Sequence, residues 1–193
     1  MRRYLKEAPV LVGTAVLLLE INAWAGGGPQ RRLYPEAQLR DRQASAQGNM
    51  TASTMVGRMA PNLLATEWIG APVDLRDYRG KVVILDFFGA WSNVSRQQIG
   101  SLRKLCERYG HQVVMVGVTN LDGQTVDKIQ EFVRKNKAPE LVAIDNQSLT
   151  HRAYQVQEIP HTFIIDREGV VQFASVAPDE TQLATEITRV LSN

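Results

Sequence analysis

The chain has 193 residues, with 22 lysines and arginines against 20 aspartates and glutamates, and its formal net charge is +2 at pH 7. The positive excess lies in residues 1–59, so residues 60–193 are slightly acidic and lack the basic surface that nucleic acids require. The single cysteine excludes a disulfide within the chain. We therefore expect no nucleic-acid partner.

The first 25 residues have the pattern of an export signal. A basic start precedes a mostly apolar run over residues 8–19, and Ala23-Trp24-Ala25 offers the small residues of a cleavage site. The run is shorter than the ~20 apolar residues of a membrane-spanning helix, and Glu20 interrupts it, but residues 21–25 would extend an uncleaved anchor. Both interpretations, a cleaved signal peptide and a membrane anchor, predict that the remainder lies outside the cytoplasm, in the periplasm or its equivalent.

Residues 26–59 have the composition of a flexible linker. They are rich in Gly, Gln, Arg, Ser and Ala and contain too few large apolar residues to fold alone. A flexible coil of this length spans ~30 Å on average. An alternative is that Leu33, Tyr34 and Leu39 anchor the segment on a partner protein. The predicted organisation is a leader over residues 1–25, this linker, and a folded domain over residues 60–193.

Strand and helix patterns alternate through the predicted domain. Short, apolar, β-branched runs predict strands at residues 81–88, 111–118, 141–144, 162–165 and 170–174. Apolar residues at helical spacing predict helices at residues 96–109, 125–136, 147–154 and 179–191. The turn Asp166-Arg167-Glu168-Gly169 joins the last two strands as a hairpin. This order predicts an α/β domain with a mixed central sheet flanked by helices on both faces.

The segment Trp91-Ser92-Asn93-Val94-Ser95 lies between the first predicted strand and the helix that follows it. A cysteine at the start of a helix is stabilised as a thiolate by the helix dipole and the free N–H groups. A serine there caps the helix, a contribution of ~1 kcal/mol. Its hydroxyl is neither an appreciable nucleophile without a base nor able to form a disulfide. We therefore expect Ser92 to be a helix cap, with Ser95 one turn later.

Residues from about 60 to the C-terminus resemble thioredoxin-fold proteins of the TlpA/ResA type. These are membrane-tethered thiol-disulfide oxidoreductases, similar also to the wider peroxiredoxin-like group. The segments that carry the resemblance are Ala60-Pro61-Asn62-Leu63, Leu75-Arg76-Asp77-Tyr78-Arg79-Gly80-Lys81-Val82-Val83, the Trp91 segment and Glu158-Ile159-Pro160-His161-Thr162-Phe163-Ile164-Ile165-Asp166. They occur in the order of the family.

The resemblance implies a site built on these segments. Ser92 and Ser95 take the places of the two redox cysteines, so the redox site is degenerate. Asp86 corresponds to the buried acid that moves protons in the family, although it could also be a strand carboxylate satisfied by polar neighbours. The pair Ile159-Pro160 is expected to have a cis peptide bond and to bind an extended segment of a partner through its backbone.

The remaining candidate residues point to no other chemistry. Cys106 is expected to be a small core residue, and a peroxidase is excluded without a peroxidatic cysteine near Ser92. His111, His151 and His161 are scattered, so we predict no metal site and no cofactor. His161 follows Pro160, and a ring that faced Ser92 would suggest a serine hydrolase, but this function is disfavoured because no third residue or oxyanion motif can be named.

Two functions follow. The first is a redox-inactive, exported or membrane-tethered module that binds a protein partner or an extended peptide at a groove formed by Trp91, Ile159, Pro160 and His161. Membrane association would come from residues 1–25. The second is a disarmed form of a membrane-tethered thiol-disulfide oxidoreductase that acts on exported proteins, including those of cytochrome maturation. The two serines have either a natural or an engineered origin, and an altered downstream helix, Arg96-Gln97-Gln98-Ile99-Gly100, favours the natural one.

Overall fold

The computed structural model of the protein describes residues 52–138 and 141–193. The predicted leader, residues 1–25, and the predicted linker up to residue 51 lie outside the described residues. Within the described ranges, no helix is both long enough and apolar enough to cross a membrane.

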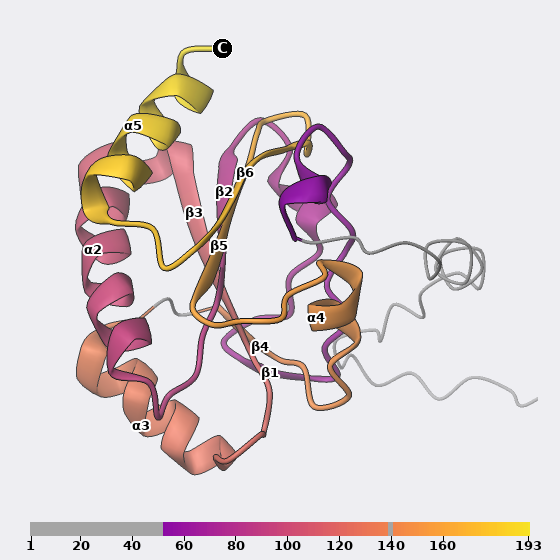
Figure 1. Cartoon of the computed structure of the whole chain (residues 1–193), viewed down its shortest axis with the longest axis vertical. Coiled ribbons are helices and arrows are strands. Elements are labelled where there is room, and N and C mark those ends of the chain that lie inside the picture. The colour runs from indigo at the N-terminus through magenta and orange to yellow at the C-terminus, as the bar shows by residue number, and fades with distance from the viewer. Residues whose placement is uncertain (1–51, 139–140) are drawn as a thin grey trace, which may run out of the picture.

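Six strands form one mixed sheet in the order β1-β4-β3-β2-β5-β6 (Figure 1). Their bounds are β1 Glu67–Ile69, β2 Val82–Phe87, β3 Val113–Thr119, β4 Val142–Ile144, β5 His161–Ile165 and β6 Val171–Val176. Strands β2, β3 and β4 are parallel, whereas β1, β5 and β6 pair antiparallel with their neighbours. The predicted mixed sheet is confirmed. Strand β1 was not predicted, because three residues are too few to show a strand pattern.

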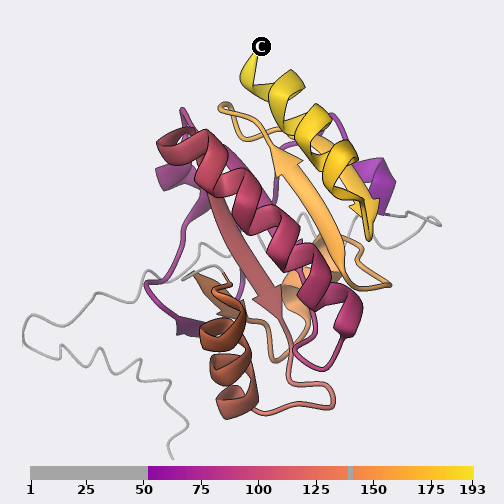
Figure 2. The same cartoon turned by 90° about the vertical axis from the view of Figure 1, so that its left-hand side faces the viewer.

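Helices cover both faces of the sheet. The α-helices are α2 Asn93–Tyr109, α3 Val126–Asn136, α4 Leu149–Ala153 and α5 Glu180–Leu191. Helices α2 and α5 lie side by side on one face (Figure 2), and α4 lies on the other (Figure 1). The structure also has short 3₁₀ helices, which are η1 Ala52–Met55, η2 Leu75–Tyr78 and η3 Gly110–Gln112.

Capping side chains stabilise the starts of α3 and α5. The side chain of Thr125 accepts a hydrogen bond from Lys128 N at the start of α3, and that of Asp179 accepts one from Gln182 N at the start of α5. Each bond satisfies an N–H group that has no partner inside the helix. The strand predicted over residues 111–118 starts later, at Val113, because the turn η3 precedes it.

Side chains alternate along β2, so this strand contributes to the core on both faces of the sheet. Val83, Leu85 and Phe87 point to the face covered by α4, whereas Val82 and Ile84 point to the face covered by α2 and α5. All five side chains are buried. Asp86 shares the second face with Val82 and Ile84, since successive strand residues point to opposite sides.

The folded domain begins earlier than the sequence predicts. Residues 52–59 belong to the predicted linker, but Ala52 and Met55 are buried in the main core. The backbone of this segment also pairs with the end of the hairpin, with hydrogen bonds from Gly57 N to Val171 O at 2.8 Å and from Val171 N to Arg58 O at 2.9 Å. The folded domain therefore includes residues 52–59. The sequence does not predict this packing, because the buried side chains of Ala52 and Met55 and the backbone hydrogen bonds produce no periodic pattern.

Candidate functional site

The candidate site lies at the end of β2, where the chain turns into α2. Ser92 Oγ accepts a hydrogen bond from Ser95 N at 3.2 Å, so Ser92 is the N-cap of α2, as predicted. Ser95 is fully buried, and its Oγ accepts a hydrogen bond from Gly89 N at 3.3 Å. Both hydroxyls therefore satisfy backbone N–H groups.

A buried polar cluster lies beneath this turn, on the α2 face of the sheet. Thr162 Oγ1 donates to Asp86 Oδ1 at 2.8 Å, and Gln98 Nε2 donates to the same oxygen at 2.7 Å. Asp86 Oδ2 and Gln98 Oε1 are buried and have no partner within the described part of the chain. Burial raises the pKa of the Asp86 carboxyl to about 7, and the two hydrogen bonds reduce this rise.

Gln98 was not identified as a site residue from the sequence. It lies on the buried stripe of α2, between Ser95 and Leu102. An uncharged polar residue on an otherwise apolar helix face is a signal for a buried hydrogen bond, because an unpaired amide there is costly. From this pattern, Gln98 could have been predicted to hydrogen-bond to Asp86 on strand β2.

The expected cis peptide bond between Ile159 and Pro160 is confirmed. Pro160 is buried, and its carbonyl accepts a hydrogen bond from Ala177 N at 2.9 Å. Neither backbone group of Ile159 has a partner among residues 52–138 and 141–193. An extended segment of another chain would find a free donor and a free acceptor at this position.

Gly89 brings Ile159 and Trp91 together. A Cβ atom at Gly89 would lie 2.7 Å from Ile159 Cδ1 and 3.0 Å from Trp91 Cε2, so only glycine fits without displacing one of them. Trp91 is 62% exposed although it is a large apolar residue. The loop before α2 and the turn before β5 therefore form one surface around Gly89.

His161 points away from Asp86, to the opposite face of the sheet. It pairs with Phe87 in the β2–β5 register, and its ring stacks on Phe163 with 4.9 Å between centroids. The ring is buried, and both ring nitrogens lack a partner within the described residues. Burial lowers the pKa of His161 to about 4, so the imidazole is neutral at pH 7. In the described chain no hydrogen bond joins it to Ser92, and its buried ring adds little to the exposed surface around Gly89.

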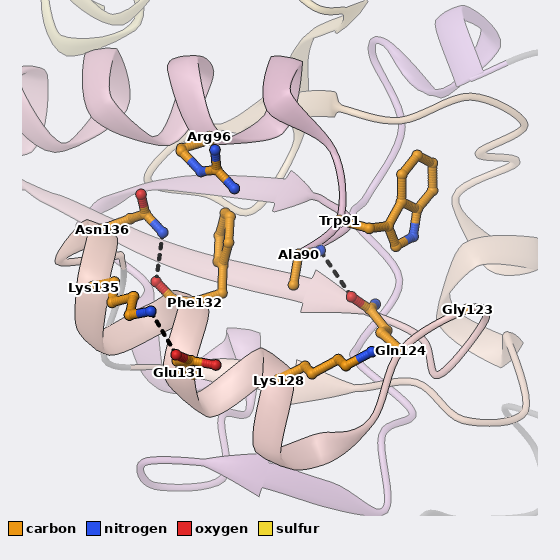
Figure 3. A pocket seen from close by; sticks show the side chains of 10 residues that line it. All are labelled: Ala90, Trp91, Arg96, Gly123, Gln124, Lys128, Glu131, Phe132, Lys135 and Asn136. Atoms are coloured by element: carbon orange, nitrogen blue, oxygen red, sulfur yellow. Dashed lines mark hydrogen bonds and ion pairs between the residues drawn. The ribbon is translucent and has the colours of Figure 1, made fainter.

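Gln124 fixes the loop that carries Trp91. Its Oε1 accepts a hydrogen bond from Ala90 N at 2.8 Å (Figure 3), and its Nε2 donates to Thr119 Oγ1 at 2.8 Å and to Asn120 O at 2.6 Å. The side chain is buried. The sequence does not identify Gln124 as a site residue, because a glutamine after a turn glycine is an ordinary surface pattern.

A pocket of about 560 Å³ opens beside Trp91, between α2 and α3 (Figure 3). Its lining includes the cationic side chains of Arg96, Lys128 and Lys135 and the carboxylate of Glu131. Lys135 Nζ lies 2.6 Å from Glu131 Oε1, so the charges of these two residues neutralise each other.

The other candidate residues lie elsewhere in the domain. Cys106 is half-buried on α2. Its burial, and to a lesser extent the negative charge of Glu107, raises the pKa of the thiol to about 11. Such a thiol is protonated at neutral pH and unreactive. His151 Nδ1 lies 2.7 Å from Asp145 Oδ2 in a separate buried pair. Among the residues that the structure describes, no group of side chains has the arrangement of a metal site.

Sequence comparisons relate this chain to known proteins. The sequence model of the AhpC/TSA family matches residues 56–174, which is more than half of the chain. The thiol-disulfide oxidoreductase ResA of Bacillus thuringiensis subsp. konkukian is 29% identical over 116 residues, which cover 60% of this chain and 66% of that protein. The ResA of Geobacillus kaustophilus is 32% identical over 117 residues, which cover 61% and 67%. The match thus extends over about two thirds of these relatives, and slightly less for the first.

Solved structures share the fold. A putative thiol:disulfide interchange protein DsbE from Chlorobium tepidum has a TM-score of 0.62 and 26% identity, over 70% of this chain and 97% of that chain. A thiol-disulfide isomerase from Corynebacterium glutamicum has a TM-score of 0.62 and 21% identity, over 69% and 97%. With the helix-covered mixed sheet, the cis peptide before β5 and the family match over residues 56–174, the chain belongs to the thioredoxin-like AhpC/TSA family.

Proposed function

We propose that this chain is a redox-inactive, thioredoxin-like protein that binds an extended segment of a partner protein outside the cytoplasm. The observation that carries the proposal is the pair of serines at the start of α2, Ser92 and Ser95, in a chain with one cysteine. A Cys-x-x-Cys site needs two sulfurs at this position to cycle between dithiol and disulfide. Cys106 is no substitute, because its half-buried thiol has a raised pKa of about 11.

A binding role is supported by the surface around Gly89. The unpaired backbone groups of Ile159 and the exposed ring of Trp91 offer hydrogen bonds and apolar contact to a strand-like segment. Neither contact needs a sulfur atom. Gln124 holds the Trp91 loop in place by bonding Ala90 N, which lowers the conformational cost of binding.

The extracytoplasmic setting is supported by the sequence of residues 1–25 and by the resemblance to membrane-tethered oxidoreductases. The basic start and the apolar run fit a signal peptide or an anchor. N-terminal sequencing of the protein purified from its native cells distinguishes these two. A mature chain that starts near residue 26 indicates cleavage, and a soluble cytoplasmic protein that retains Met1 contradicts export.

The binding proposal is tested by affinity purification of the full chain from native membranes. We expect a stoichiometric partner with the wild type and its loss with Trp91→Ala. The matched control is Val94→Ala, since Val94 is also an exposed apolar residue, 50% exposed, three positions further along the chain. Recovery of the wild-type protein alone contradicts the proposal, as does equal recovery of the partner with Trp91→Ala.

A disarmed oxidoreductase is the second candidate, favoured by the retained acid Asp86. Its buried carboxyl has a pKa raised to about 7, which suits an acid that exchanges protons near neutral pH. The double variant that carries Ser92→Cys and Ser95→Cys tests the hypothesis of a disarmed oxidoreductase. Reduction of insulin disulfides by the double variant, with dithiothreitol as the electron source, and by neither single variant supports a disarmed enzyme. A double variant that folds and forms its disulfide but does not reduce insulin excludes it.

A further inference from the structure

The pocket beside Trp91 adjoins the surface at Ile159, and its cationic side chains outnumber its carboxylates. Arg96 donates a hydrogen bond to Asn93 Oδ1 at 3.0 Å and meets no carboxylate in the described chain. The side chain of Lys128 has no ion pair or hydrogen bond with any residue in the described ranges. Because Glu131 is neutralised by Lys135, the pocket retains two positive charges from Arg96 and Lys128.

This positive charge is a local feature. Residues 1–51 hold seven of the 22 lysines and arginines and four of the 20 aspartates and glutamates, which leaves one net negative charge on residues 52–193. Helix α2 also has no acidic residue in its first turn, where Arg96 lies. An acid is the favourable residue at that end of a helix, so the partial positive charge of the helix start adds to the charge of the pocket.

The pocket is continuous with the surface that the proposed function uses. Trp91 lines the pocket, and it also approaches Gly89 together with Ile159. Figure 3 shows Arg96 and Lys128 on opposite sides of the pocket and Trp91 at its edge. A segment that pairs with the backbone of Ile159 and crosses Trp91 would therefore reach both cations.

We propose that this pocket binds acidic side chains of the partner segment, so that the partner carries aspartate or glutamate next to the residues that cross Trp91. The inference rests on the proposed binding function and adds the chemistry of the partner. Paired charges at the rim of an interface set partner choice and association rate more than total affinity. The pocket thus selects an acidic segment among extended segments that the Ile159 backbone alone would accept equally.

The test is a binding titration of the full chain with short synthetic peptides. One peptide alternates glutamate with apolar residues, a second replaces each glutamate with glutamine, and a third replaces each with lysine. We expect the glutamate peptide to bind more tightly than the glutamine peptide and the lysine peptide to bind most weakly. The preference for the glutamate peptide is expected to decrease as salt is added, because exposed charges are screened.

Lys128→Glu is the informative variant, and Arg134→Glu is its matched control. Both residues are exposed on α3 and undergo the same charge change, but Arg134 does not line the pocket. Loss of one exposed ion pair weakens binding by up to about fivefold, and repulsion by the new carboxylate adds a similar factor. We expect Lys128→Glu to weaken the glutamate peptide about tenfold or more and Arg134→Glu to change it less than twofold.

The outcomes separate this inference from the proposed function. If the glutamate and glutamine peptides bind equally and Trp91→Ala abolishes both, the binding function stands and the acidic preference is wrong. If no peptide binds, both are wrong. Equal weakening by Lys128→Glu and Arg134→Glu indicates a general charge effect and overturns the pocket. Complete competition by free glutamate indicates a site for small anions and also overturns the peptide assignment.

Discussion

Neighbouring residues of β2 and β5 point to opposite faces of the sheet, and the two faces have different chemistry. Asp86 and Thr162 face α2, where they form a small polar cluster with Gln98. Phe87 and His161, each one position away, face α4 and join a cluster of aromatic rings. Burial raises the pKa of Asp86 to about 7 and lowers that of His161 to about 4, so it favours the neutral form of each group.

Strands β2 and β5 thus carry a polar cluster on one face of the sheet and an aromatic cluster on the other. The polar face lies beneath the start of α2, where a proton acceptor would serve a redox pair. The aromatic face packs three large buried rings, those of Phe87, Tyr154 and Phe163, whose centroids lie 5.0–5.6 Å apart. We infer that the aromatic face supplies stability and that the polar face lowers it at neutral pH. This difference can be tested one residue at a time.

Phe87→Ala is expected to have the largest effect. Phe87 is fully buried and contacts His151, Tyr154 and Phe163, so its truncation leaves a cavity in the aromatic face. We expect a loss of about 3–5 kcal/mol in the free energy of unfolding, measured by urea denaturation. Phe173→Ala, at a half-buried position on the other face, is the control and is expected to cost less. Equal losses would contradict the assignment of stability to the aromatic face.

Asp86→Asn is expected to increase stability at pH 8. The folded-state pKa of about 7 exceeds the ordinary 3.8, so the folded protein binds more protons and its stability falls as pH rises from about 4 to 7. Asparagine remains neutral and avoids this loss. Above pH 7 we expect the variant to be more stable by up to about 4 kcal/mol, and near pH 3 we expect no difference. A variant less stable than the wild type at pH 8 would mean that the carboxylate is favourable in the fold.

His161→Phe is expected to act at the opposite end of the pH range. The pKa of His161 is about 4 in the folded protein and 6.5 ordinarily, so stability falls as pH decreases from about 6.5 to 4. Phenylalanine retains a ring to stack on Phe163 and does not titrate. We expect the variant to gain about 3 kcal/mol relative to the wild type at pH 4, compared with the difference at pH 8. The histidine C–H signals in NMR spectra give the pKa directly, and a value near 6.5 would refute the prediction.

Ser92→Ala is expected to have the smallest effect. It removes the cap of α2, in which Ser92 Oγ accepts from Ser95 N, and we expect a loss of about 1 kcal/mol in the free energy of unfolding. Ser92→Asp is the control, since aspartate caps as well as serine does. If alanine and aspartate lower stability equally, the hydroxyl has a role other than capping.

The sequence predicted part of both sites: Asp86 on the polar face, and Trp91 and the Ile159-Pro160 pair on the binding surface. It did not predict Gln98, Gln124 or the cationic pocket. The buried strand, the helix after it and the capping serine follow from local spacing, and the structure confirms each of them. Asp86 and the cis bond at Pro160 were expected from the family resemblance, and the structure shows a buried carboxyl and the cis bond. The predicted domain start at residue 60 was wrong, because residues 52–59 pack through contacts that have no local pattern.

The sequence by itself determined the absence of a second cysteine and the order of the helices and of strands β2 to β6. These depend on composition and on spacing over a few residues, whereas the family was indicated by the resemblance of whole segments. Only the tertiary structure decided the partners of Asp86, the direction of His161 and the cationic pocket. Gln98 and Thr162 are 64 positions apart, and Ala90 and Gln124 are 34 apart, yet each pair is in contact. Such contacts arise when the sheet and helices pack, so the chemistry of the two faces emerges only in the folded chain.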